Sequence, residues 1–137
     1  MKVFFDTNIL VYLFDAGAPA KQRQARSLLD KHTRAGETLL STQVLQEFYV
    51  AVTRKLATVL EPEVAYEAVK ELAVMPSVRV DTPLILSAIQ LGRQHQLSFW
   101  DALIIRSALE GGASTLYSED MQHGQTFGAL TVENPLR

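Results

Sequence analysis

Short apolar runs alternate along the chain with longer segments in which apolar residues recur every three or four positions. The first run, residues 3–5, is β-branched and aromatic and stops at Asp6, which predicts a buried parallel strand. Four further runs of this kind predict strands at residues 38–41, 77–80, 115–118 and 130–132.

Helical periodicity fills the segments between these runs. Helices are predicted at residues 9–14, 20–34, 42–56, 62–75, 83–94 and 98–109. Strands separated by helices imply right-handed crossovers and a parallel sheet covered on both faces. The pattern therefore predicts one α/β domain over residues 1–137, a three-layer α/β/α sandwich with a central, mainly parallel sheet.

Two of these helices carry specific local signals. In the helix expected at residues 42–56, an apolar stripe at i, i+3, i+4 and i+7 predicts a half-buried surface helix, formed by Leu45, Phe48, Tyr49, Val52 and Leu56. Ser41 or Thr42 is expected to cap it. Thr82 and Pro83 are expected to be the N-cap and first residue of the fifth helix.

Composition narrows the class of protein. The chain has 137 residues, 47% of them hydrophobic and 20% charged, which is typical of an ordinary globular domain. It has no cysteine, which excludes disulfides, thiol nucleophiles and Cys-ligated zinc and favours a cytoplasmic location. Only three apolar residues separate Lys2 from Asp6, so neither a signal peptide nor a membrane partner is expected. The net charge of −2 argues against a nucleic-acid-coating protein but not against a nuclease.

Four acidic residues occupy positions at which they can meet. Asp6 and Asp120 follow predicted strands, and Asp101 lies in the first turn of the sixth predicted helix. Glu47 lies beside the apolar stripe of the helix predicted at residues 42–56. Like charges brought together repel one another and raise one another's pKa values. A hard cation with oxygen ligands, Mg²⁺ or Mn²⁺, resolves that repulsion and can activate water on a phosphate.

Each carboxylate also has a purely structural explanation. Asp101 lies three residues after Ser98, as in a capping box. Glu47 could be a solvated helix residue and Asp120 a turn residue. Asp6 is the hardest to explain in this way, because an apolar strand gives no structural reason to end on a charge.

Three other side chains are candidates for function. His123 could assist a metal or a phosphate, although an ordinary loop histidine is the simpler interpretation. Phe99 and Trp100 could stack on a base. Because they begin a strongly apolar helix, we expect them to belong to the core.

Four segments resemble one family in the same order along the chain: Phe5-Asp6-Thr7-Asn8-Ile9-Leu10, Ser41-Thr42-Gln43-Val44-Leu45-Gln46-Glu47-Phe48, Phe99-Trp100-Asp101-Ala102-Leu103-Ile104 and Leu116-Tyr117-Ser118-Glu119-Asp120-Met121. The chain resembles a PIN domain, a small metal-dependent nuclease, and among these the VapC-type ribonuclease toxins of toxin–antitoxin pairs. The resemblance covers essentially the whole chain.

The resemblance implies catalytic and metal-binding roles for Asp6, Glu47, Asp101 and Asp120, with Thr7 or Asn8 supporting them by hydrogen bonds. It implies Mg²⁺- or Mn²⁺-dependent endonucleolytic cleavage of RNA. It also implies a homodimer inhibited by a cognate antitoxin protein. Glu119 is the alternative to Asp120 as the fourth acid.

Other functions remain open at this point. A PIN domain can process RNA without being a toxin, and the fold can serve as a non-catalytic interaction module. An aspartyl-phosphate phosphatase would need a second Asp at position 8, which is Asn8. A receiver-like domain would need a Lys at the end of a late strand, and none lies near residues 115–118 or 130–132.

Overall fold

The computed structural model describes residues 1–137. Its elements, in chain order, are β1 (Lys2–Phe5), α1 (Thr7–Val11), the 3-10 helix η1 (Tyr12–Phe14), α2 (Pro19–Arg34), β2 (Thr38–Ser41), α3 (Thr42–Arg54), α4 (Pro62–Leu72), β3 (Ser77–Val78), α5 (Thr82–His95), α6 (Phe99–Glu110), β4 (Ala113–Tyr117), β5 (Thr126–Phe127) and β6 (Leu130–Glu133).

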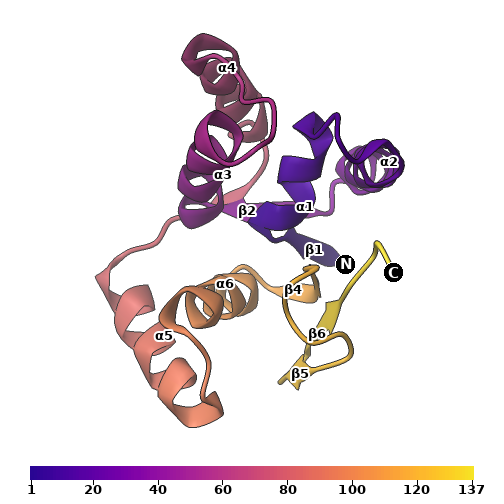
Figure 1. The fold of residues 1–137 in the computed structure, drawn as a ribbon. Coiled ribbons are helices and arrows are strands. Elements are labelled where there is room, and N and C mark those ends of the chain that lie inside the picture. The colour runs from indigo at the N-terminus through magenta and orange to yellow at the C-terminus, as the bar shows by residue number, and fades with distance from the viewer.

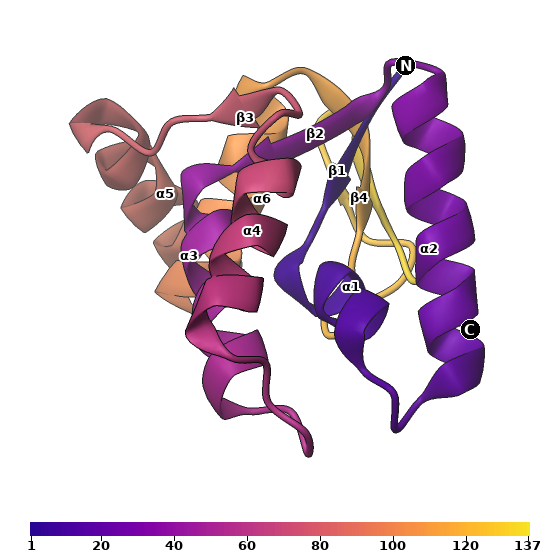
Figure 2. The same ribbon diagram turned by 90° about the horizontal axis from the view of Figure 1, so that it is seen from above.

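The six strands form one sheet in the order β3-β2-β1-β4-β6-β5. All neighbouring pairs are parallel except β5 and β6. Helices α1 to α4 cover one face of the sheet, and α5 and α6 cover the other (Figure 1). The view from above shows α1 and α2 beside β1, and α3 and α4 beside β2 (Figure 2). The predicted α/β/α class with a mainly parallel sheet is confirmed.

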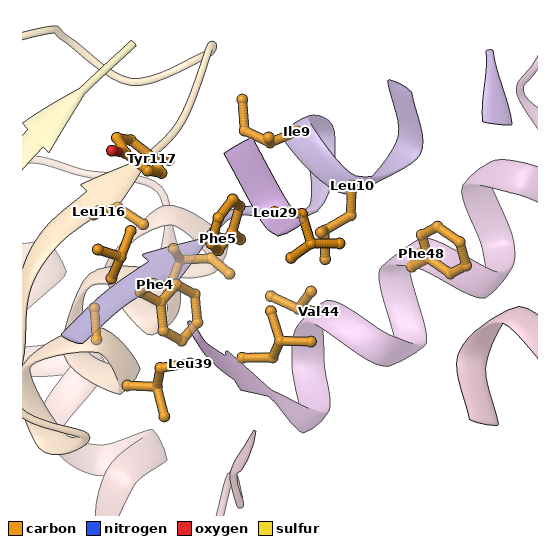
Figure 3. Packing of buried hydrophobic residues seen from close by; sticks show 14 of the residues in the cluster. Phe4, Phe5, Ile9, Leu10, Leu29, Leu39, Val44, Phe48, Leu116 and Tyr117 are labelled. Atoms are coloured by element: carbon orange, nitrogen blue, oxygen red, sulfur yellow. The ribbon is translucent and has the colours of Figure 1, made fainter. Parts of the chain in front are cut away.

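The core is built around the first strand. Phe4 and Phe5 have no exposed surface, and both belong to a single cluster of 26 buried residues. The ring of Phe5 meets those of Tyr117 and His32 edge to face, with centroids 5.4 and 6.1 Å apart. Figure 3 shows the aromatic pair of β1 between apolar side chains of the neighbouring strands and helices. The strand that ends at Asp6 is therefore fixed on both faces.

The buried face of α3 is turned relative to the predicted stripe. Val44, Phe48 and Val52 are fully buried, whereas Tyr49 is 39% exposed. Tyr49 and Leu45 instead face α4 and line a shallow apolar groove between the two helices. The prediction that Tyr49 belongs to the buried face is wrong, because α4 covers that side of α3 only in part.

One helix cap, one strand end and one additional strand also differ from the prediction. Asp81, and not Thr82, caps α5, because its carboxylate accepts a hydrogen bond from Leu84 N. Strand β3 ends at Val78 instead of residue 80, since Val80 N donates to the Thr42 side chain instead of extending the sheet. The antiparallel strand β5 was not predicted, because its two residues are too few to show a pattern.

No helix of the chain combines the length and the apolar character that crossing a bilayer requires.

Candidate active site

All six side chains predicted to act line one pocket of about 740 Å³. They are Asp6, Thr7, Asn8, Glu47, Asp101 and Asp120. The pocket opens where β1, β2 and β4 end and where α6 begins. The carboxyl ends of parallel strands are the usual location of ligand sites in open α/β sheets. The fold thus brings together residues that are more than 100 positions apart in the sequence.

Asp6 is buried at the base of this pocket, 7% exposed. Its carboxylate accepts hydrogen bonds from Thr7 N at 2.7 Å, from Ser118 Oγ at 2.8 Å and from Asn8 Nδ2 at 3.3 Å. Burial raises the pKa of Asp6 to about 6; the bonds from Ser118 and Thr7 oppose the rise, and the nearby negative charges of Glu47 and Asp120 add to it. Asp6 is therefore a fixed carboxylate that lacks a compensating positive charge.

Glu47 is held at both oxygens. Thr7 Oγ1 donates to Oε1 at 2.7 Å, and Gln43 Nε2 donates to Oε2 at 3.1 Å. Thr7 also donates its backbone N–H to Asp6, so this one residue joins the carboxylate of β1 to the carboxylate of α3. These bonds hold the Glu47 side chain in one orientation at the pocket wall.

Asn8 joins Asp6 to Asp120 by hydrogen bonds, as Thr7 joins Asp6 to Glu47. Its Nδ2 donates to Asp120 Oδ2 at 3.0 Å as well as to Asp6, and its Oδ1 accepts from Glu119 N at 3.2 Å. The amide of Asn8 thus holds the turn after β4 against the end of β1. The predicted supporting positions at Thr7 and Asn8 both make hydrogen bonds to predicted site acids.

Asp101 reaches the pocket from the first turn of α6. Ser98 caps that helix by accepting a hydrogen bond from Asp101 N at 3.1 Å. The capping interaction thus uses the backbone of Asp101, while its carboxylate lines the pocket. Partial burial raises the pKa of Asp101, and the negative charges of Asp120 and Glu47 raise it further against the opposing effect of the Ser98 hydroxyl.

Glu119 also lines the pocket, but its carboxylate is bound by two partners of its own. Lys21 Nζ donates to its Oε2 at 2.6 Å, and the Tyr12 hydroxyl donates to its Oε1 at 2.5 Å. Although partial burial acts in the opposite direction, the bonds from Lys21 and Tyr12 hold the pKa of Glu119 below its ordinary value. Its neighbour Asp120 has no cationic partner and is bound by the Asn8 amide. This contrast favours Asp120 as the fourth acid.

The donor set suits a hard divalent cation. The pocket offers carboxylate oxygens without sulfur or imidazole ligands, and two of the acids have raised pKa values because they are buried beside like charges. No three of these side chains are gathered closely enough to form a complete ligand set on their own. Because Mg²⁺ binds through one or two carboxylates and keeps several waters, the residues present fit such an ion.

Sequence reasoning missed two polar contributors. Ser118 lies directly after β4, and its hydroxyl bonds to Asp6. Gln43 is 3% exposed and bonds to Glu47 and to the carbonyl oxygen of Trp100 at 3.2 Å. The position of Ser118 at a strand end could have identified it as a pocket residue. Nothing in the sequence could have identified Gln43, because a Gln on a helix is usually a surface residue.

The predictions for Phe99, Trp100 and His123 have mixed outcomes. Phe99 is half-buried against the small cluster around Leu84, whereas Trp100 is 61% exposed at the pocket, so its assignment to the core is wrong. His123 lies outside the pocket and accepts a hydrogen bond from Asn134 N at 3.0 Å, a structural role. His32 is buried between Glu37 and Tyr117.

Fold and pocket together define a class: a three-layer α/β/α protein with an acidic pocket at the carboxyl ends of its central parallel strands. The family model of the PIN domain matches residues 3–126. The chain belongs to the PIN domain family, as the four sequence segments predicted.

Solved structures share the fold. VapC20 of Mycobacterium tuberculosis, a toxin that cleaves the sarcin–ricin loop, has a TM-score of 0.69 and 22% identity over 87% of this chain and 90% of that one. A chain of a toxin–antitoxin complex from Klebsiella pneumoniae has a TM-score of 0.71 and 18% identity, with 98% of each chain covered. VapBC2 of Rickettsia felis bound to a promoter DNA fragment has a TM-score of 0.68 and 18% identity, over 97% of this chain and 98% of that one. No curated protein matches by sequence.

Proposed function

We propose that this protein is an Mg²⁺- or Mn²⁺-dependent endoribonuclease that hydrolyses RNA phosphodiester bonds and acts as the toxin of a type II toxin–antitoxin pair. The observation that carries the proposal is the meeting of Asp6, Glu47, Asp101 and Asp120 in one pocket of a PIN domain. Solved proteins of the same fold include a toxin that cleaves the sarcin–ricin loop, which supports RNA as the substrate.

The surroundings of the four acids suggest a different role for each pair. Asp6 and Asp101, the two acids with raised pKa values, are the proposed main ligands of the cation. When bound, the ion neutralises the carboxylates, polarises the phosphate and lowers the pKa of a water. Glu47 and Asp120, held by Thr7 and Asn8, complete the ligand set or orient that water.

The charge pattern of the pocket also suits a phosphodiester. Lys55 lines the pocket, and it is not paired with any acidic side chain. It supplies positive charge to a substrate phosphate that the carboxylates alone would repel. The hydroxyls of Thr7 and Tyr12 donate to the pocket carboxylates of Glu47 and Glu119, and we assign them the role of holding these side chains, so water is the proposed nucleophile.

The partners follow from the same relatives. Toxin–antitoxin complexes among the solved structures support a cognate antitoxin protein as partner, and we also propose a homodimer in the cytoplasm. A PIN nuclease that processes RNA without being a toxin is the alternative. Expression in cells with and without the product of the adjacent gene separates the two, because only a toxin arrests growth that this product restores.

The choice of the fourth acid gives a matched test at adjacent positions. We expect Asp120→Asn to lower the rate of metal-dependent RNA cleavage by about 100-fold, because it removes a charge but keeps an acceptor for Asn8. We expect Glu119→Gln to retain the rate within a few-fold, because Lys21 and Tyr12 already occupy that carboxylate. Single-turnover cleavage of a labelled RNA measures both variants, and equal losses would contradict the assignment.

A further inference from the structure

Trp100 is exposed to solvent, although the packing of its helix, α6, gives no reason for this exposure. The other apolar residues of α6 face inward: Ala102, Leu103, Ile104, Ile105 and Ala108 are buried, and Phe99 and Leu109 are partly so. Trp100, the only tryptophan of the chain, is 61% exposed. An indole left in solvent forgoes one of the largest burial energies available to a side chain, which marks it as a residue to explain.

The exposed ring belongs to the acidic pocket. Trp100 lines it together with its neighbour Asp101 and the other three predicted acids. On the ribbon, the start of α6 lies on the opposite face of the sheet from α3, which carries Glu47 (Figure 1). A ligand that reaches the carboxylates between these elements therefore lies next to the indole.

The position of Trp100 is fixed relative to the acids. Gln43 Nε2 donates to Trp100 O at 3.2 Å and to Glu47 Oε2 at 3.1 Å. Because both of these partners are acceptors, the amide nitrogen of Gln43 must be the atom that faces them. The Phe99 ring contacts the indole at a centroid distance of 4.9 Å and an angle of 73°. The buried Gln43 thus fixes the backbone of Trp100 next to Glu47, and the Phe99 ring packs edge to face against the indole at the edge of the pocket.

We propose that Trp100 is a stacking platform for an unpaired nucleobase next to the scissile phosphate of the RNA. This inference rests on the proposed nuclease function. Aromatic side chains bind the face of any base, and only unpaired bases offer that face, since the bases of a duplex already stack on one another. Stacking at Trp100 places the adjoining phosphate beside Asp101.

Fluorescence tests the contact directly, because the only tryptophan of the chain is the proposed platform. Titrating the Asp120→Asn variant in Mg²⁺ with a short single-stranded oligoribonucleotide is expected to quench the emission. The same oligonucleotide in a duplex is expected to leave the emission nearly unchanged. Equal quenching by both, or quenching by neither, overturns the proposal.

Kinetics provides the second measurement. We expect Trp100→Ala to lower kcat/KM on single-stranded RNA by about tenfold, mainly through KM, because one stacked base contributes on this scale. Trp100→Phe is expected to recover most of the loss. The control is Tyr66→Ala, which removes an equally exposed aromatic residue from α4, outside the pocket, and is expected to have no effect.

The outcomes separate this proposal from the nuclease function. If the wild type cleaves RNA and Trp100→Ala cleaves it equally well, the platform is wrong and the nuclease stands. If the wild type cleaves no RNA, the proposed function fails, and the fluorescence titration still decides whether Trp100 stacks. If Trp100→Ala alters only self-association or binding of a protein partner, measured by light scattering, the ring is a protein contact and the proposal is overturned.

Discussion

Asp101→Asn is expected to lower the rate of RNA cleavage by about 1000-fold while leaving the fold intact. Asp101 lines the pocket from the first turn of α6, and burial together with the charges of Asp120 and Glu47 raises its pKa. Removing its charge relieves repulsion among the acids, so stability without metal should be unchanged or slightly higher. Single-turnover rates and thermal unfolding of the same purified sample measure both quantities.

A control separates the pocket from charge removal in general. Asp30→Asn makes the same chemical change on α2, outside the pocket, and should cleave RNA like the wild type. Undiminished cleavage by Asp101→Asn would remove Asp101 from the catalytic set. If the melting temperature of Asp101→Asn falls so far that unfolding accounts for the lost activity, Asp101 serves the fold instead.

The burial of Asp6 predicts an unusual pH dependence of stability in metal-free protein. Burial in the folded state raises the pKa of Asp6 from its ordinary value of 3.8 to about 6. The folded protein therefore binds an extra proton between these values, and the stability that this proton confers is complete below pH 3.8 and lost as pH rises through 6. At about 1.4 kcal/mol per pKa unit, the loss approaches about 3 kcal/mol.

Asp6→Asn is the matching variant, because an amide cannot titrate. Any cost of placing its NH₂ among the donors Thr7 N, Ser118 and Asn8 is independent of pH. Between pH 4 and pH 7.5 in EDTA, the free energy of unfolding of the wild type should fall relative to Asp6→Asn by about 2–3 kcal/mol. Urea denaturation measures this difference. Parallel pH profiles for the two proteins would contradict a buried, unpaired Asp6.

Hydrophobic periodicity predicted most of the fold, because most helices and strands carry a recognisable pattern within their own residues. The predicted strand at residues 3–5 and the predicted helices at residues 20–34 and 98–109 agree within a few residues with β1, α2 and α6. Strand β5 could not be predicted from two residues, and the rotation of α3 depends on how much of it α4 covers. Such features are decided by tertiary packing, which a local pattern does not contain.

The site was predictable as far as the topology of parallel sheets dictates it. Strand ends and helix starts converge at one edge, so Asp6, Asp101 and Asp120 could be placed together from the sequence. The hydrogen bonds that distinguish one acidic residue from its neighbour could not be predicted from the sequence. The family resemblance favours Asp120 over its neighbour Glu119, and the bonds from Lys21 and Tyr12 to Glu119 are a further distinction that the sequence does not show. Trp100 was assigned to the core because hydrophobicity alone does not reveal which side of a helix start faces a pocket.

Asn8 also bears on the aspartyl-phosphate alternative. Where a phosphatase of that class needs a second aspartate, this chain has an amide that bonds to Asp6, Asp120 and the backbone of Glu119. An amide in that position cannot serve as the acid of such a mechanism, while it does hold two carboxylates in the pocket. The contacts of Asn8 therefore favour the acidic set over the phosphoenzyme.

Metal dependence of RNA cleavage tests the central claim most directly. Purified wild-type protein is incubated with an end-labelled single-stranded RNA in EDTA and again after Mg²⁺ or Mn²⁺ is restored, and the product ends are mapped. The account predicts no cleavage in EDTA, recovery with the metal, and products without a 2′,3′-cyclic phosphate, because water and not the 2′-hydroxyl attacks. Cleavage that persists in EDTA and leaves cyclic phosphate ends would contradict it.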